Sequence, residues 1–186
     1  THETPSTAVV TGDAGLGLVV APFAMQVAID KAATCGTGWV SVKNSNHFGI
    51  AAYHAMMALQ YDMMGIAMTN ASPLVAPTFS IDKMLGTNPI CVAAPAGNEP
   101  AFVADLATTT AANGKLEILQ RKNLQTPDGW VQDKDGNSTN DPHALKTGGA
   151  KKVCLPAFSI AVKFGKGWTP LATCALPASY LESKDW

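Results

Sequence analysis

The sequence is short of charge, and above all of arginine. Charged residues make up 15% of its 186 positions, the formal net charge is −1, and Arg121 is the single arginine. No long basic or acidic run occurs, which argues against a nucleic-acid partner or electrostatic attachment to a membrane surface. Because arginine is the usual bidentate partner of a carboxylate, the chain offers one candidate at most for that task. A hydrophobic content of 47% predicts a globular protein with a core.

Long apolar runs and cysteine clusters are also missing. No stretch approaches the ~20 uninterrupted apolar residues of a spanning helix, so we expect no membrane partner. The cysteines are scattered and form no Cys-x-x-Cys pair: Cys35, Cys91, Cys154 and Cys174. Such spacing predicts buried thiols in a reducing compartment, the cytoplasm, rather than disulfides. It also matches no Cys/His ligand pattern, and we therefore expect no metal.

The common nucleotide and nucleophile motifs are absent as well. Gly12, Gly15 and Gly17 follow the order G-x-x-G-x-G, which differs from the G-x-G-x-x-G fingerprint of a Rossmann site. Neither a Walker loop nor a G-x-S-x-G elbow occurs. Any nicotinamide enzyme with this sequence must therefore bind its cofactor in another way.

Strand and helix patterns alternate over the first 70 residues. We predict strands at 6–11, 39–42 and 63–68 and helices at 17–33 and 48–59. Apolar spacing predicts these inward side chains: Val20, Phe23, Ala24, Val27 and Ala28 in the first helix, and Ile50, Tyr53, Met57 and Tyr61 in the second. His54 is expected to face solvent or its helix neighbours. Two β-α-β-like passages in a row favour an α/β or mixed α+β fold.

The sequence changes character after Asn70. Short strands are predicted at 90–94 and 101–104 and a helix at 108–121. Residues 122–149 are polar and rich in Asp, Asn, Gly and Pro, which predicts an excursion on the surface. From residue 150 onward no clean periodicity remains.

His47 is the leading candidate for chemistry. It stands between the predicted strand 39–42 and the predicted helix 48–59, where a loop can present it to a ligand. An imidazole with an ordinary pKa near ~6.5 can take or give a proton at neutral pH. The alternative remains that His47 is a satisfied surface or capping residue.

Three polar segments adjoin predicted strands. Asn70-Ala71-Ser72-Pro73 follows one strand, Gly86-Thr87-Asn88-Pro89 precedes another, and Asp105-Leu106-Ala107-Thr108-Thr109 follows a third. Polar loops at strand ends are what a ligand cleft beside a sheet requires. Three ordinary turns are the alternative.

Several ordered segments resemble one family. They are Asn44-Ser45-Asn46-His47-Phe48-Gly49-Ile50-Ala51, Met68-Thr69-Asn70-Ala71-Ser72-Pro73-Leu74-Val75-Ala76-Pro77, Leu85-Gly86-Thr87-Asn88-Pro89, Asp105-Leu106-Ala107-Thr108, Gly114-Lys115-Leu116-Glu117-Ile118 and Gly129-Trp130-Val131-x-Asp133-Lys134-x-Gly136. Together they resemble the type-2 malate/L-lactate dehydrogenases, a superfamily that includes ureidoglycolate, sulfolactate and cyclic-imine reductases. The resemblance covers roughly residues 6–149. The first four of these segments, in the same order, are far more specific than any one of them, and the last two extend the match.

The resemblance implies a fold and a chemistry. The fold is a mostly antiparallel, non-Rossmann nicotinamide-binding sheet flanked by helices, here incomplete. It implies a partial nicotinamide-dinucleotide domain at 1–149 and a divergent tail at 150–186. It further implies NAD or NADP as cofactor, a small 2-hydroxy or 2-oxo acid such as malate or lactate as substrate, and a homodimer in the cytoplasm. His47 falls at the family's proton-acceptor position. The residues that fall at or beside the cofactor are Ala71, Asp105, Leu106, Ala107, Asn70, Ser72, Thr87 and Asn88.

The chain departs from the family in two places. The upstream Ser-His-Gly segment and its arginine, which face the substrate, do not occur in this sequence. Downstream, the family's Lys-Gly-Tyr-Gly-Leu stretch has only an echo at 165–173, which includes Lys166. We therefore expect an incomplete chain. The alternative function is a non-catalytic remnant that keeps a partial dinucleotide pocket or a dimer surface.

Overall fold

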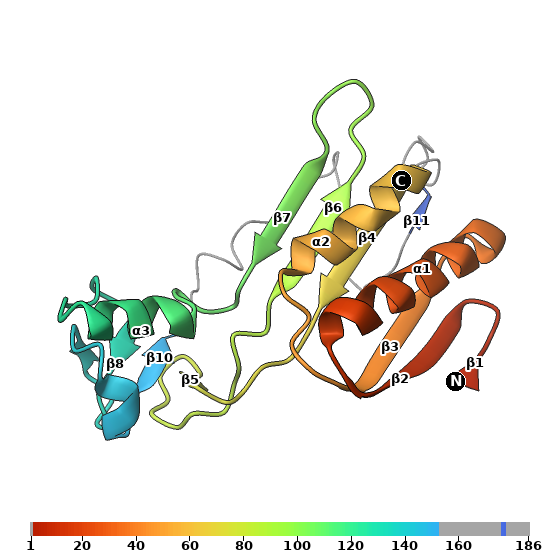
Figure 1. Ribbon diagram of the computed structural model, residues 1–186. Helices are drawn as coiled ribbons and strands as arrows, with labels where there is room; N and C mark the ends of the chain where they lie inside the picture. The colour runs from red at the N-terminus through yellow and green to blue at the C-terminus, as the bar shows by residue number, and fades with distance from the viewer. Residues whose placement is uncertain (1, 153–175, 178–186) are drawn as a thin grey trace. The chain divides into compact units, whose positions relative to one another are not determined.

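The protein forms two compact units, here described from a computed structural model that covers residues 2–152 and 176–177 (Figure 1). Of the described residues, unit 1 contains 2–68, 90–105 and 176–177, and unit 2 contains 69–89 and 106–152. Each unit combines helices with sheets in which antiparallel pairs outnumber parallel ones. The predicted mixed α/β class is confirmed. The expected boundary between residues 149 and 150 stays a prediction.

Unit 1 begins with a β-α-β passage. Its elements are β1 (His2–Glu3), β2 (Thr7–Gly15), α1 (Gly17–Cys35) and β3 (Trp39–Ser45), with strand order β1-β2-β3. β2 and β3 are parallel, Thr7 opposite Trp39, and α1 runs alongside them (Figure 1). Gly38 lets the start of β3 approach the α1 backbone, because an added Cβ would overlap the Ala28 carbonyl. This passage confirms the first predicted strand, helix and strand.

A second sheet of unit 1 has the order β11-β4-β6-β7. Its strands are β4 (Met63–Met68), β6 (Ile90–Ala94), β7 (Phe102–Leu106) and β11 (Leu176–Pro177), and β4 runs antiparallel to both β6 and β11. The short α2 (Ala51–Met56) and the 3-10 turn η1 (Met57–Tyr61) pack on it. The core between them is made of small side chains: Ala51, Ala55, Ala67, Cys91 and Ala93.

The predicted inward faces of the two helices are confirmed at Ala24 and Ala28, and partly buried Met57 packs against the core, but the prediction is wrong at the aromatic residues and Ile50. Phe23, Tyr53 and Ile50 are each at least 60% exposed, and Tyr61 is 49% exposed. Besides Ala24 and Ala28, the buried positions are Ile29 and Ala32 in α1, and Ala51, His54, Ala55 and Ala58 in α2 and η1. The reason is the close approach of helix to strand at Gly38 and Gly65, which leaves room only for small residues.

Helix α1 is long and apolar enough, by length and composition alone, to cross a membrane, with 19 residues and a mean hydropathy of 1.3. In unit 1 its Ile29 and Ala32 pack against Ala58 and Met63. The helix ends at Gly36, whose φ of 79° and N–H bond to the Ala32 carbonyl form a left-handed cap. These contacts are those of a helix that covers a sheet, although only part of its surface is buried.

Unit 2 contains short strands around one helix. These are β5 (Val75–Ala76), β8 (Val131–Gln132), β9 (Ser138–Thr139) and β10 (Ala150–Lys152), in the order β5-β10-β8-β9, with α3 (Asn113–Arg121) and the 3-10 turn η2 (Ala144–Thr147). Leu116 of α3, Val131 and Ala144 form a buried cluster, with Trp130 and Leu145 packed on it. β10 runs parallel to β5 and antiparallel to β8.

Two sequence expectations fail in unit 2. Residues 122–149 are not only a surface excursion, because they supply Val131 and Ala144 to the core. The predicted helix at 108–121 begins only at Asn113. Lys151 is also buried, and burial lowers the pKa of its ammonium group. The sequence Ala-Lys-Lys of β10 has no apolar pattern by which a buried strand could be recognised.

Candidate active site

His47 lies on an exposed turn between β3 and α2. Its Nδ1 accepts a hydrogen bond of 3.0 Å from the Gly49 N–H, and Gly49 has a φ of 83°, which favours glycine. A backbone N–H can only donate, so Nδ1 carries a lone pair and the neutral ring has its hydrogen on Nε2. The turn thus fixes both the orientation and the tautomer of the imidazole.

Asn46 ties the upstream side of this turn to the β2–α1 connection. Its side-chain Nδ2 donates to the carbonyls of Ala14 (2.6 Å) and Gly15 (3.3 Å), and its N–H donates to Gly15 at 3.1 Å. Gly17 opens α1 at the same place, where an added Cβ would overlap the Asn46 carbonyl. The residue before His47 is therefore held by a distant part of the chain.

His54 ties the downstream side. It is 2% exposed, and its Nε2 lies 2.7 Å from the Phe48 carbonyl oxygen. Its ring stacks on Phe48 with centroids 4.8 Å apart, and Tyr53 meets it edge-on at 5.3 Å. Because a carbonyl only accepts, His54 must carry its hydrogen on Nε2. The sequence expectation that His54 faces solvent or its helix neighbours missed this contact with the turn.

Asp105, at the end of β7, is bound to the first turn of α2. Its Oδ2 accepts a 2.9 Å hydrogen bond from the Ala52 N–H, a favourable partner for the unpaired amides of a helix start. Cys91 of β6 is fully buried, and burial together with the nearby Asp105 carboxylate raises the pKa of its thiol to about 11. Asp105 thus connects the sheet of unit 1 to the helix that follows His47.

The other expected cofactor residues lie in unit 2. The Ala71 N–H donates to Asn88 Oδ1 at 2.9 Å. The Thr87 carbonyl oxygen accepts from both the N–H (2.8 Å) and the hydroxyl (3.0 Å) of Thr108. Gly86 leaves the space for the first contact, because an added Cβ would overlap the Ala71 carbonyl. These bonds join the segments 70–72, 86–88 and 106–108 of unit 2 into one group of loops. Asn70 and Ser72 are exposed in it, and Leu106 and Ala107 are half-buried.

Two further expectations concern charge and metal. Arg121 lies at the end of α3 in unit 2, where its Nε donates to the Glu117 carbonyl at 3.3 Å. Within residues 2–152 and 176–177, no group of three or more His, Cys, Asp or Glu could hold a metal ion. Lys166 lies outside the residues that the structure describes.

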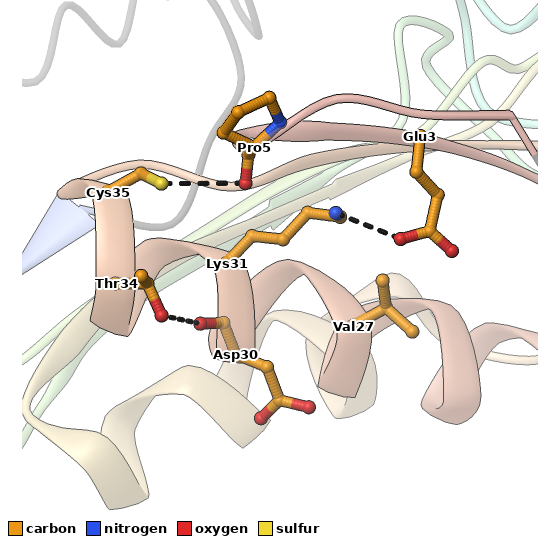
Figure 2. Close-up of a pocket in the computed structure, with 7 residues that line it drawn as sticks. All are labelled: Glu3, Pro5, Val27, Asp30, Lys31, Thr34 and Cys35. Carbon is orange, nitrogen blue, oxygen red and sulfur yellow. Dashed lines mark hydrogen bonds and ion pairs between the residues drawn. The ribbon is translucent and has the colours of Figure 1, made fainter.

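A shallow open hollow of about 450 Å³ occurs at the C-terminal half of α1 (Figure 2). It is lined by Glu3, Pro5, Val27, Asp30, Lys31, Thr34 and Cys35. The Lys31 ammonium is already bound to Glu3 at 3.1 Å and to the Thr4 carbonyl at 2.8 Å. The lining includes none of the residues expected from the sequence to act in catalysis or cofactor binding.

The fold and this site define a non-Rossmann α/β protein that holds an exposed imidazole in a fixed turn. The sequence profile of the malate/L-lactate dehydrogenase family matches residues 1–170, and the chain belongs to this family. This confirms the resemblance seen in the sequence motifs.

Individual relatives support the same assignment. Malate dehydrogenase of Pyrococcus horikoshii is 49% identical over 149 residues, which are 80% of this chain and 41% of that protein. Ureidoglycolate dehydrogenase (NAD(+)) of Escherichia coli strain K12 is 33% identical over 141 residues, 76% of this chain and 40% of that protein. The solved structure of sulfolactate dehydrogenase from Methanocaldococcus jannaschii has a TM-score of 0.78 at 35% identity, covering 96% of this chain and 58% of that one. The chain therefore spans well under half the length of these two curated relatives.

Proposed function

We propose that this chain contributes the nicotinamide-binding part of an oxidoreductase that transfers a hydride between NAD(P) and a small 2-hydroxy acid. The observation that supports this most strongly is the match of residues 1–170 to the family. The exposed His47 in its fixed turn agrees with it. The relatives named above are called malate, ureidoglycolate and sulfolactate dehydrogenases, and these names favour a malate- or lactate-like substrate. A homodimer in the cytoplasm belongs to the same proposal.

The residues of unit 2 suit a dinucleotide in part. Gly86 lets the segments of Ala71 and Asn88 approach each other closely, and exposed Asn70 and Ser72 offer polar groups beside them. We assign Asn70, Ala71, Ser72, Thr87 and Asn88 to cofactor binding on this basis. When bound, the nicotinamide supplies the hydride acceptor and donor.

Asp105, Leu106 and Ala107 complete the proposed cofactor set. Asp105 already accepts from Ala52, so its contribution includes orienting the adjoining backbone as well as any direct contact. Leu106 and Ala107 follow it, are half-buried and carry no side-chain polar group. Their contribution is therefore through backbone N–H and carbonyl groups.

In this proposal His47 accepts the substrate's hydroxyl proton as the hydride leaves. That role carries a requirement: with Nε2 protonated, the lone pair of the neutral ring is on Nδ1, where the Gly49 N–H is bound. Proton acceptance therefore requires the imidazole to release Gly49, either by rotation about the Cβ–Cγ bond or by displacement when the substrate binds. The exposed position of His47 leaves the ring accessible to a substrate.

Replacing His47 tests the proposal. We expect His47→Ala to lower turnover of malate or lactate by about 10²- to 10⁴-fold, the usual contribution of a general base, while cofactor binding is kept. His143→Ala is the matched control, because His143 is also exposed but lies in unit 2 next to η2. Nicotinamide fluorescence titration and the rate of NAD(P)H formation measure the two properties.

Each outcome of these assays has a distinct meaning. Cofactor binding with turnover that depends on His47 supports the enzyme. Binding without turnover in the unchanged chain supports the non-catalytic remnant with a partial dinucleotide pocket. No binding at all leaves a structural or dimerisation role. Turnover that is equal in His47→Ala and the unchanged chain removes His47 from the mechanism.

A further inference from the structure

We propose that His54 is a positioning residue that sets the orientation and tautomer of His47 through the Phe48–Gly49 peptide group. The inference deepens the proposed function and rests on it for the catalytic consequence. Its structural basis is a contact that no sequence motif predicts, the bond between buried His54 and the turn that holds His47.

One peptide group takes part in both hydrogen bonds. The Phe48 carbonyl accepts from His54 Nε2 at 2.7 Å, and the N–H of the same peptide, which belongs to Gly49, donates to His47 Nδ1 at 3.0 Å. The peptide unit is planar, so fixing the direction of its carbonyl fixes the direction of its N–H. The orientation of His54 is thereby transmitted to His47 through a single rigid group.

Electrostatics act in the same direction as geometry. A hydrogen bond to a carbonyl polarises the peptide and makes its N–H a better donor, so consecutive bonds of this kind strengthen one another. The chain of donors runs from His54 Nε2 through the peptide to His47 Nδ1. Loss of the first donor should therefore weaken the second hydrogen bond.

The surroundings hold the His54 ring in place but leave one of its nitrogens unpaired. Phe48 stacks on its ring, Tyr53 meets it edge-on, and its Nδ1 is buried with no hydrogen-bond partner among the described residues. A buried polar atom left unpaired is unfavourable, and an apolar side chain at this position would avoid that cost. The donation from Nε2 to Phe48 is what an apolar side chain could not supply.

The first measurement is the tautomer of His47, which needs no catalytic activity. Long-range proton–nitrogen NMR of the complete chain with ¹⁵N-labelled histidine reports whether the ring hydrogen is on Nε2 or Nδ1, and the His47→Ala spectrum identifies the signals. We expect one Nε2–H tautomer in the unchanged protein. In His54→Phe, which keeps a ring to stack but has no donor, the ratio should shift toward the Nδ1–H form by roughly fivefold, the factor that one net hydrogen bond of about 1 kcal/mol supplies.

Conservative variants separate positioning from packing. His54→Gln places an amide N–H2 at about the reach of Nε2 and should restore the tautomer, whereas the shorter His54→Asn should not. Tyr53→Leu removes a ring contact to His54 without touching the Phe48 carbonyl and should leave His47 unchanged. If His54→Phe does not fold, the comparison of Gln with Asn decides the question.

Kinetics then test the catalytic consequence. Because proton acceptance requires His47 to release Gly49, a weaker Gly49 bond should raise kcat in His54→Phe by up to about fivefold. We expect kcat to return to the unsubstituted value in His54→Gln, with the KM for the cofactor unchanged in both. An unchanged His47 tautomer in both His54→Phe and His54→Asn would overturn the positioning role even if the enzyme is active. If the protein without substitutions shows no turnover, the proposed function is refuted. The NMR result would still decide whether His54 positions His47.

Discussion

Gly65 is the position where a single methyl group should disturb unit 1 most. It lies in β4, is buried, and faces the backbone of α2. An added Cβ would overlap the Ala55 carbonyl oxygen and lie 2.9 Å from the Ala55 carbonyl carbon and 3.0 Å from the Ala58 Cβ. Favourable carbon–carbon contacts require about 3.5–4.0 Å, so both carbon contacts fall short by roughly 0.5–1 Å. Gly65→Ala therefore requires α2 to move as a whole.

The size of the effect follows from what can yield. Ala55 and Ala58 are fully buried, and the nearest atoms belong to backbone and a methyl group rather than to the end of a flexible side chain. Overpacking a core generally costs about 1–3 kcal/mol, and a displaced helix backbone puts Gly65→Ala near the upper end. For a chain of this length, about 3 kcal/mol corresponds to a Tm lower by roughly 6–12 °C.

Urea unfolding followed by circular dichroism, with linear extrapolation, measures the change in free energy. Gly114→Ala is the matched control, because an added Cβ at Gly114 in α3 meets nothing within 4 Å. That variant should be neutral or more stable by up to about 1 kcal/mol, since alanine favours a helix. A Gly65→Ala protein as stable as the unchanged chain, within about 0.5 kcal/mol, would show that β4 and α2 are not packed this closely.

Two further predictions concern the cofactor loops and the thiols. Gly86→Ala should push Ala71 away from Asn88, because the added Cβ would lie 2.6 Å from the Ala71 carbonyl carbon and 2.5 Å from Asn88 Oδ1. We expect the Kd for NAD(P), measured by fluorescence titration, to rise at least about tenfold, or ~1.4 kcal/mol. An unchanged Kd would remove this loop from the site. Iodoacetamide at pH 8 should modify exposed Cys35 and spare buried Cys91, as measured by peptide mass spectrometry. The pKa of about 11 leaves on the order of one Cys91 side chain in a thousand as thiolate at that pH. Equal labelling of both cysteines would contradict the burial of Cys91.

Local patterns were sufficient for the strands that lie between clear turn signals. The strands at 63–68 and 90–94 were predicted to the residue, because uninterrupted apolar runs end there at Asn70 and Pro95. The predicted helix faces were wrong at their aromatic residues for a different reason. Hydrophobicity alone ranks Phe23 and Tyr53 above alanine, yet helix and sheet approach so closely that only small residues fit between them. The spacing of small residues was the better guide.

The same spacing would have found His54. Ala51, Ala55 and Ala58 follow i, i+4 and i+7, and His54 falls on that face at i+3 from Ala51. A histidine placed among buried alanines needs a hydrogen-bond partner, which directs attention to a nearby carbonyl. The sequence alone does not identify the carbonyl that accepts this bond, because that depends on how the turn after β3 folds back on α2.

His47 itself could be recognised from its motif, but the means of holding it could not. Three contacts fix its turn: Asn46 to the β2–α1 connection, His54 to Phe48, and Asp105 to the Ala52 N–H. The first and third join residues 32 and 53 positions apart in the chain, so each depends on the tertiary fold of unit 1. A proton-transfer residue held in this way is only as well ordered as the packing around it. The Gly65→Ala substitution should therefore disturb His47 through α2, although no atom of Gly65 belongs to the site.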